Sequence, residues 1–264
     1  MSHRPRKRFG QNFLVDLAVI QQILDCIQPK PGQRIVEIGP GKGAITRGLL
    51  HGAGELDAVE LDRDLIQPLQ KSCASFGELR IHNADALTFD FCSLTGDKEA
   101  LRLVGNLPYN ISTPILFHLL DQARCVQDMH FMLQKEVVDR MAAGPGSKTY
   151  GRLSVMLQAR CEVTPLFDIA PDAFKPAPKV NSSFVCLVPF QSPRFDIEDE
   201  GMFGKVVAQA FSQRRKTLRN TLKGYLDAPG MEGIGIDPGL RAENLGVGDF
   251  VRIANLACKR GSLA

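Results

Sequence analysis

Long hydrophobic runs are missing from this chain of 264 residues. None of its apolar stretches approaches the roughly 20 residues that a membrane-spanning helix needs, which excludes an integral membrane protein. The basic start, Met1 to Arg8, is not followed by the apolar segment of a secretory signal. We therefore expect a cytoplasmic protein that has no membrane partner.

Paired, metal-binding cysteines are also missing. The seven cysteines are scattered along the chain, and no two of them are spaced as Cys-x-x-Cys. An odd number of cysteines without metal-ligand spacing predicts reduced thiols and no zinc. The five histidines show no catalytic spacing. We therefore expect neither a metal ion nor a histidine tuned for catalysis.

A strong net charge is the third feature that the chain lacks. The 32 Lys and Arg residues against 29 Asp and Glu residues leave a net charge of only +3. A surface for nucleic acid must therefore come from the distribution of the charges. One basic cluster lies near the start of the chain and comprises Arg4, Arg6, Lys7 and Arg8.

A second basic cluster lies on a helix that we predict over residues 204–223. Four apolar residues of this helix fall near one face, which should be buried: Val207, Phe211, Leu218 and Leu222. The basic residues should be solvated: Arg214, Arg215, Lys216, Arg219 and Lys223. Such clusters suit an RNA phosphate backbone. Taken by itself, the helix is equally well explained as an ordinary solvated face.

Three glycines at alternate positions follow a short apolar strand predicted over residues 34–38. Gly39, Gly41 and Gly43 allow close approach of a ligand to the backbone and positive φ angles. Their spacing differs from the Gly-x-Gly-x-x-Gly of dinucleotide sites, and Glu37 places a carboxylate where a pyrophosphate would be repelled. We predict that Gly39 and Gly41 bind a cationic nucleoside cofactor, S-adenosylmethionine. A nicotinamide or flavin cofactor is the alternative.

Acidic or amide side chains follow the next three predicted strands. Glu60 ends the second strand about 20 positions after Gly39, where a Rossmann-like fold holds the ribose hydroxyls. Asp85 follows the third strand and is predicted to accept a hydrogen bond from the adenine amino group. Asn106 ends the fourth strand. Taken singly, these residues are explained equally well as a solvated strand end and as turn caps. Their repetition at successive strand ends predicts one shared site.

The tetrapeptide Asn106-Leu107-Pro108-Tyr109 offers the groups that grip an adenine base. The Asn106 side-chain oxygen and the Leu107 carbonyl are two acceptors for an exocyclic amino group, and Tyr109 supplies a flat ring. Accepting both N–H bonds would localise charge on the amino nitrogen, which is otherwise a poor nucleophile. Orientation and preorganised polar groups, with no strong general base, should then suffice for methyl transfer.

Strands and helices alternate from Arg34 to about Ala143, as in a doubly wound α/β sheet. A helix over 152–160 and strands over 162–167 and 182–189 are predicted next. The segment from Pro189 to Pro193 indicates a boundary. We expect a catalytic domain over residues 1–190 that binds the cofactor, and a small helical domain over 191–264 that contacts RNA.

Several motifs over nearly the whole chain resemble the KsgA (RsmA) family, the small-subunit ribosomal RNA adenine N6,N6-dimethyltransferases. They are KRFGQNFL (7–14), the glycine loop (36–43), ELD (60–62), NLPYNISTP (106–114), QKEVV (134–138), YGRLSV (150–155), FKPAPKV (174–180) and RRKTLRN (214–220). The resemblance implies a Rossmann-like class I methyltransferase sheet of seven mostly parallel strands, followed by a small all-helical C-terminal domain.

The resemblance also implies residue roles. In the family, the cofactor site is lined by residues matching Asn12, Leu14, Gly39, Glu60, Asp85 and Asn106. The segment matching Asn106, Leu107, Pro108 and Tyr109 holds the target base, and the residue matching Phe184 packs against that base. The implied reaction is S-adenosylmethionine-dependent dimethylation of two adjacent adenosines in the 3′-terminal hairpin loop of small-subunit rRNA, without a metal. The partner would be a pre-30S-like particle, and we expect a monomer with a role in ribosome biogenesis.

Three alternatives stay open. A large-subunit rRNA adenine methyltransferase would carry similar motifs. A DNA adenine methyltransferase could use the same Asn-x-Pro-Tyr chemistry. A catalytically idle ribosome assembly factor could keep the fold, although the intact Glu60, Asp85 and Asn106 argue against it.

Overall fold

The computed structural model describes residues 12–95 and 100–261. The chain forms two compact units. The first comprises residues up to 138 together with 164–189, and the second comprises 139–163 together with residues from 190 onward. The basic cluster of Arg4, Arg6, Lys7 and Arg8, and the first part of the motif at 7–14, lie outside the described residues.

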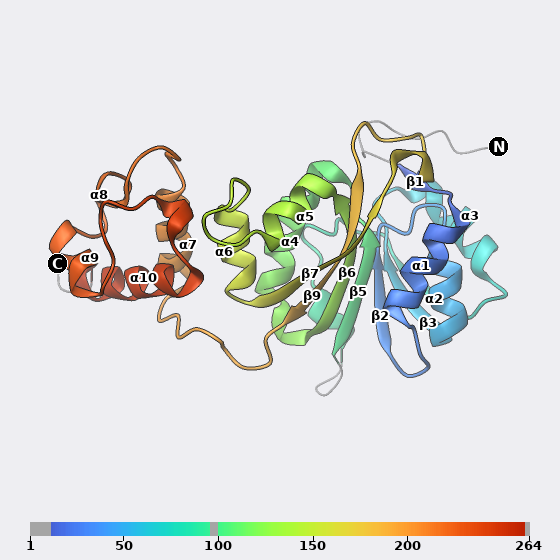
Figure 1. Cartoon of the computed structure of the whole chain (residues 1–264). Coiled ribbons are helices and arrows are strands. Elements are labelled where there is room, and N and C mark those ends of the chain that lie inside the picture. The colour runs from blue at the N-terminus through green and yellow to red at the C-terminus, as the bar shows by residue number, and fades with distance from the viewer. Residues whose placement is uncertain (1–11, 96–99, 262–264) are drawn as a thin grey trace. The chain divides into compact units, whose positions relative to one another are not determined.

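A seven-stranded sheet organises the first unit (Figure 1). Its order is β4-β3-β2-β5-β6-β9-β7. The strands are β2 (Arg34–Ile38), β3 (Glu55–Val59), β4 (Glu78–His82), β5 (Leu101–Asn106), β6 (Val126–Gln134), β7 (Cys161–Ile169) and β9 (Ser182–Pro189). Strands β2 to β6 run parallel to their neighbours, and β9 runs antiparallel to β6. The class I methyltransferase fold expected from the sequence is confirmed.

The central strands are apolar because they are buried. β2, β3 and β5 have almost every residue buried, as in parallel strands that are covered on both faces. β2 lies between β3 and β5, so the chain reverses its direction of travel across the sheet at β2. In an open α/β sheet, the crevice outside the carboxyl ends of the strands at such a switch point is where ligands bind.

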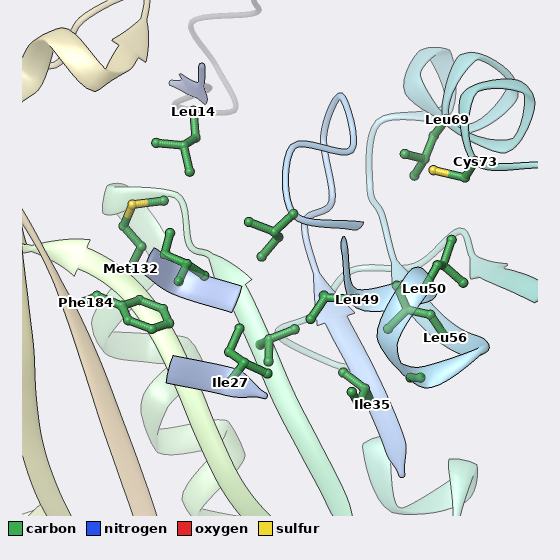
Figure 2. Close-up of a cluster of buried hydrophobic side chains, with 14 of the residues drawn as sticks. Leu14, Ile27, Ile35, Leu49, Leu50, Leu56, Leu69, Cys73, Met132 and Phe184 are labelled. Carbon is green, nitrogen blue, oxygen red and sulfur yellow. The ribbon is translucent and has the colours of Figure 1, made fainter. Parts of the chain in front are cut away.

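Amphipathic helices cover this sheet. The first unit contains α1 (Leu17–Ile27), α2 (Thr46–Ala53), α3 (Arg63–Cys73), α4 (Ser112–Asp121) and the first half of α5 (Lys135–Ala142). Asp16 caps α1 by accepting from the amides of Ala18 and Val19. Figure 2 shows the core between the sheet and the helices α1, α2 and α3, with Met132 and Phe184 at one side and Leu50 and Leu56 at the other.

A second, two-stranded sheet joins segments that are far apart in the sequence. β1 (Phe13–Leu14) pairs antiparallel with β8 (Phe174–Lys175). The amides of Val15 and Asp16 both donate to the Ala173 carbonyl, which continues this attachment. The pairing fixes the beginning of the described chain beside the long connection between β7 and β9.

The second unit is helical apart from the start of β7. It contains α6 (Arg152–Gln158), α7 (Glu200–Ala210), α8 (Leu218–Thr221), α9 (Ala228–Gly233) and α10 (Val247–Gly261), of which α7 to α10 form the orange and red part of Figure 1. The expected boundary at residue 190 coincides with the point at which this unit resumes. The unit also includes residues 139–163, which we had assigned to the catalytic domain. The division at 190 stays a prediction.

The continuous helix predicted over residues 204–223 is wrong. α7 ends at Ala210, where the Ser212 hydroxyl donates to the Gln209 carbonyl at 2.6 Å, and α8 begins only at Leu218. A side chain that bonds a nearby carbonyl competes with the helical pattern. The apolar pattern still identified the core: Val207, Leu218 and Leu222 are fully buried.

The prediction that all seven cysteines are reduced is also wrong. Cys92 and Cys125 form a disulfide across 33 positions of sequence, while Cys26, Cys73, Cys161, Cys186 and Cys258 are free. The two cysteines meet because the Gln122 side chain, next to the helical turn η4 (Ala123–Cys125), accepts from the Phe91 amide of the turn η2 (Phe91–Leu94) at 2.7 Å. Only the tertiary fold creates this proximity. In the part of the chain that the structure describes, no helix is both long and apolar enough to cross a membrane.

Candidate active site

The glycine loop joins β2 to α2 at the switch point of the sheet. Gly39, Gly41 and Gly43 have φ angles of 67°, 59° and 79°, in the left-handed region that favours glycine. A Cβ on Gly41 would lie 3.2 Å from the Phe13 ring, so the loop backbone approaches β1 closely. The loop is held in place because the Gly39 amide donates to the Val59 carbonyl at 2.9 Å.

Glu60 ties two loops together just after β3. One carboxylate oxygen accepts from the Gly41 amide at 3.1 Å, and the other accepts from the Asp62 amide at 2.8 Å. The residue is only 6% exposed, and burial raises the pKa of its carboxyl although both backbone bonds oppose the shift. Glu60 therefore shapes the glycine loop, and its remaining lone pairs are what a ribose hydroxyl could use.

Glu37 is a deeply buried carboxyl group of the site. It is 2% exposed, and its Oε2 atom has no hydrogen-bond partner among the described residues. Burial raises the pKa of Glu37 to about 8, partly opposed by the Thr46 hydroxyl and reinforced by the charge of Glu60. An unpartnered buried polar atom is costly unless a ligand completes it. Here a cation or a hydrogen-bond donor would do so.

Asp85 lies in the loop after β4. Its Oδ1 atom accepts from the Leu87 amide at 2.9 Å, and its carbonyl accepts from the Thr88 amide at 3.1 Å. The side chain thus caps a turn. Among the described residues the other carboxylate oxygen accepts no protein hydrogen bond, so the capping and the binding interpretations are compatible.

Asn106 ends β5 with its two amide atoms in different roles. Its Nδ2 atom donates to the Asn12 carbonyl at 3.0 Å. Because a carbonyl can only accept, this bond fixes which end of the amide faces Asn12. Among the described residues, Oδ1 accepts no protein hydrogen bond. The geometry therefore presents an oxygen where the sequence predicted an acceptor for an amino group.

Tyr109 and Phe184 are two aromatic residues of the site. The Leu107 amide donates to the Met132 carbonyl at 3.2 Å, which fixes the segment that carries Pro108 and Tyr109 to β6. The Tyr109 hydroxyl shares a 2.6 Å hydrogen bond with Ser182. Phe184 is only 1% exposed and pairs across the strands with Met132. Its ring is therefore part of the wall of the site and does not project from it.

The strand β1 brings Asn12, Phe13 and Leu14 to the glycine loop. The Lys42 ammonium lies 4.4 Å from the centre of the Phe13 ring, within the range of a cation–π contact. Together with the bond from Asn106 to the Asn12 carbonyl, this contact attaches the N-terminal strand to both the glycine loop and the end of β5.

A cavity of about 330 Å³ joins these features. All the residues predicted to bind the cofactor or the base line it: Asn12, Leu14, Gly39, Gly41, Glu60, Asp85, Asn106, Leu107, Pro108, Tyr109 and Phe184. Four carboxyl groups line it as well, from Glu37, Glu60, Asp62 and Asp85, of which Glu37 has its pKa raised to about 8 by burial, against the single base Lys42 among the described residues. A cavity with this balance suits a cationic ligand. Over residues 12–95 and 100–261, no three His, Cys, Asp or Glu side chains cluster as a metal site would require.

The predicted RNA-binding residues lie in the second unit. Arg214, Arg215 and Lys216 are exposed in the turn between α7 and α8, Arg219 is exposed on α8, and Lys223 is exposed just beyond it. Arg214 is engaged within this unit, because its guanidinium contacts Glu243 at 3.2 Å and the Lys148 carbonyl. The other four present their charge to solvent.

Several site residues were not predicted from the sequence. Lys42 and Phe13 lie within quoted motifs, but their contact depends on the pairing of β1 with β8. Ser182 precedes Phe184 by two positions in a strand and therefore lies on the same face of it. The strand predicted over residues 182–189 already implied this arrangement.

Comparison with known proteins gives consistent results. Residues 2–259 match the family model described as ribosomal RNA adenine dimethylase. The chain is 56% identical to ribosomal RNA small subunit methyltransferase A of Marinomonas sp. (strain MWYL1), over 98% of this chain and 97% of that protein. It is similar to the crystal structure of a dimethyladenosine transferase from Plasmodium falciparum, with a TM-score of 0.81 and 25% identity over 94% of this chain and 98% of that one.

A third likeness concerns the fold alone. The crystal structure of the 23S rRNA methyltransferase ErmE superposes with a TM-score of 0.73 at 23% identity, over 94% of this chain and all of that one (100%). The name of that protein specifies the large-subunit RNA. A shared fold therefore does not by itself identify the target.

Proposed function

The chain belongs to the ribosomal RNA adenine dimethylase family, and from this premise we propose that it dimethylates N6 of two adjacent adenosines in the 3′-terminal hairpin loop of small-subunit rRNA. The methyl donor would be S-adenosylmethionine. The observation that carries the proposal is one cavity that is lined by three groups. They are the side-chain oxygen of Asn106, which can accept a hydrogen bond, the ring of Tyr109, and the Glu37 carboxyl, whose Oε2 atom has no partner among the described residues.

The residues around the glycine loop fit S-adenosylmethionine. Glu37 offers an unpartnered buried oxygen to a donor or cation, and the Gly39–Gly41 backbone leaves room for close approach. Glu60 would bind the ribose hydroxyls, and Asp85 would bind the adenine amino group of the cofactor. Asn12 and Leu14 would line the cofactor site. When bound, the cofactor supplies a methyl group on a sulfonium, which is a good leaving group.

The residues at the end of β5 would hold the target base. The Asn106 oxygen and the Leu107 carbonyl would accept hydrogen bonds from the two N–H groups of the adenine amino group. The nitrogen lone pair would then be less delocalised into the ring and would point toward the methyl group. Tyr109 stacks on the base, and Phe184 supports it from the sheet. The chain contributes orientation and preorganised acceptors and needs no strong base.

The target base must leave its stack to reach this cavity, which costs less in a hairpin loop than in a duplex. The exposed cations Arg215, Lys216, Arg219 and Lys223, with Arg214, would bind the phosphates of the surrounding RNA. We propose a cytoplasmic monomer that acts on a pre-30S-like particle during ribosome biogenesis.

Transfer of tritium from labelled S-adenosylmethionine tests the proposal. Small ribosomal subunits that lack the modification, large subunits and duplex DNA are incubated separately, and the product is digested to nucleosides. We expect N6,N6-dimethyladenosine from the small subunit alone. Label in the large subunit or in DNA would overturn the substrate. Cofactor binding without any transfer would favour an assembly factor.

A further inference from the structure

Ser182 is a buried hydroxyl next to the proposed base site. It is 0% exposed, and its Oγ atom lies 2.6 Å from the Tyr109 hydroxyl, a short hydrogen bond between two neutral groups. Ser182 does not line the cavity, whereas Tyr109 does. The serine is therefore bonded to a residue that lines the cavity, at the far end of the tyrosine side chain.

The two ends of Tyr109 are held by different elements. Its backbone belongs to η3 (Tyr109–Ile111), a helical turn that is closed by the Ile111 amide donating to the Pro108 carbonyl at 3.1 Å. Its hydroxyl is held by β9, which is paired with β6 over six residues. Without the bond to Ser182, the ring could turn toward the cavity that it lines, and ordering it against a base would cost side-chain entropy.

The strand β9 presents two neighbouring side chains to this place. Ser182 and Phe184 are two positions apart and so lie on the same face of the strand. Ser182 pairs across the strands with Gln134, and Phe184 pairs with Met132, which also lines the cavity. One rigid strand therefore sets both the position of the Phe184 wall and the tilt of the Tyr109 ring.

We propose that Ser182 is a positioning residue that fixes the Tyr109 ring for stacking on the target adenine by holding its hydroxyl. This inference rests on the proposed function. It assigns the hydroxyl of Tyr109 to orientation of the ring rather than to chemistry.

The test combines kinetics with a double-mutant cycle. Ser182→Ala should lower kcat on small subunits by about threefold to tenfold, the range expected for one hydrogen bond. The dissociation constant of S-adenosylmethionine should stay within about twofold, since the serine does not touch that site. Tyr109→Phe keeps the ring and β9 intact and should show the same loss. The double variant should lose no more than either single variant.

Ser183→Ala is the matched control. Ser183 is the next residue of β9, is also buried, and donates to the Phe167 carbonyl at 3.3 Å on the other face of the strand. Its loss should lower the melting temperature but leave kcat near that of the parent protein. Additive losses in the cycle, or equal losses of kcat in Ser182→Ala and Ser183→Ala, would overturn the positioning role.

A second readout needs neither RNA nor cofactor. The chain has three tyrosines and no tryptophan, so a protein labelled with 3-fluorotyrosine gives few fluorine resonances. The signal that disappears in Tyr109→Phe belongs to Tyr109. We expect it to shift and broaden in Ser182→Ala but not in Ser183→Ala. An unchanged signal would overturn the inference. A parent protein that methylates no small subunits would instead overturn the proposed function, and the fluorine spectra would still decide whether Ser182 fixes the ring.

Discussion

Asn106 uses its two amide atoms for two tasks. The nitrogen binds the N-terminal strand through the Asn12 carbonyl, and the oxygen is left for the target base. Asn106→Ala should therefore lower kcat by roughly 100-fold or more, as for the loss of a preorganised polar group at a reaction centre. Affinity for S-adenosylmethionine should weaken only in part. Initial rates on small subunits and calorimetric titration of the cofactor separate the two effects, and a near-normal kcat would contradict the proposed grip.

Glu37 makes the stability of the free protein depend on pH. Its carboxyl has a pKa of about 8 in the folded chain against 4.5 when unperturbed. The folded state therefore holds the proton more tightly, and the contribution to stability is complete below pH 4.5 and is lost as the pH rises to about 8. Glu37→Gln removes this loss, which amounts to at most about 5 kcal/mol.

Thermal unfolding of the cofactor-free protein between pH 5 and pH 8 measures this effect. We expect the difference in melting temperature between Glu37→Gln and the parent to grow in favour of the variant as the pH rises. Added S-adenosylmethionine should narrow the difference, because a bound cation stabilises the ionised carboxylate only in the parent. A difference that does not change with pH would contradict the assignment of the buried proton to Glu37.

At the scale of an element, the glycine loop combines two constraints that can be separated. Gly41 and Gly32 both have positive φ angles, 59° and 81°. A Cβ on Gly41 would press against the Phe13 ring, whereas a Cβ on Gly32 would have nothing within 4 Å. Either substitution by alanine costs about 1–2 kcal/mol of backbone strain.

Gly41→Ala and Gly32→Ala should therefore lower the melting temperature by similar amounts, about 2–8 °C. Only Gly41→Ala should also raise the dissociation constant of S-adenosylmethionine, by about tenfold or more, because it displaces β1 from the cavity. Scanning calorimetry and cofactor titration of the two variants check this pair of outcomes. Equal cofactor affinity in both variants would show that the loop does not shape the site.

The elements that the sequence predicted well are those whose burial follows from their own residues. The strand over 34–38 and the strand over 182–189 coincide with β2 and β9, since both are apolar runs with clear ends. The helix over 204–223 failed because the apolar pattern continues across a turn. Val207 and Leu218 are both fully buried although α7 and α8 are separate helices. Periodicity detects the buried face and does not detect where side-chain bonds to the backbone end a helix.

The predictions for the site divide in the same way, between features set by local sequence and features set by tertiary packing. Gly39, Glu60, Asp85 and Asn106 could be predicted because each follows its own strand, and parallel strands bring their carboxyl ends to one edge. The Tyr109–Ser182 bond and the Cys92–Cys125 disulfide could not, because each joins segments through tertiary packing, the second across 33 positions. The residues around each partner do not indicate that the two segments meet in the folded chain. The double role of Glu60, which binds the Gly41 and Asp62 amides, was hidden for the same reason.

At the scale of the whole molecule, the net charge of +3 conceals an acidic cavity and a basic turn in different compact units. The cavity concentrates Glu37, Glu60, Asp62 and Asp85, while the second unit exposes Arg215, Lys216, Arg219 and Lys223. Opposite charges on separate units allow a cationic cofactor and an anionic RNA to be attracted to different places. The bulk value alone would have argued against RNA.

The basic turn can be tested by the dependence of RNA binding on salt. Each phosphate contact that is lost should reduce the slope of log Kd against log salt concentration by roughly 0.7–0.9. Arg215→Gln with Arg219→Gln should therefore reduce the slope by more than 1 and weaken binding to small subunits most at low salt. Lys30→Gln with Lys71→Gln removes the same charge from exposed positions of the first unit and is the matched control. Filter binding over a salt series separates the two pairs. Equal slopes in both would mean that the basic residues of the turn are only a solvated surface.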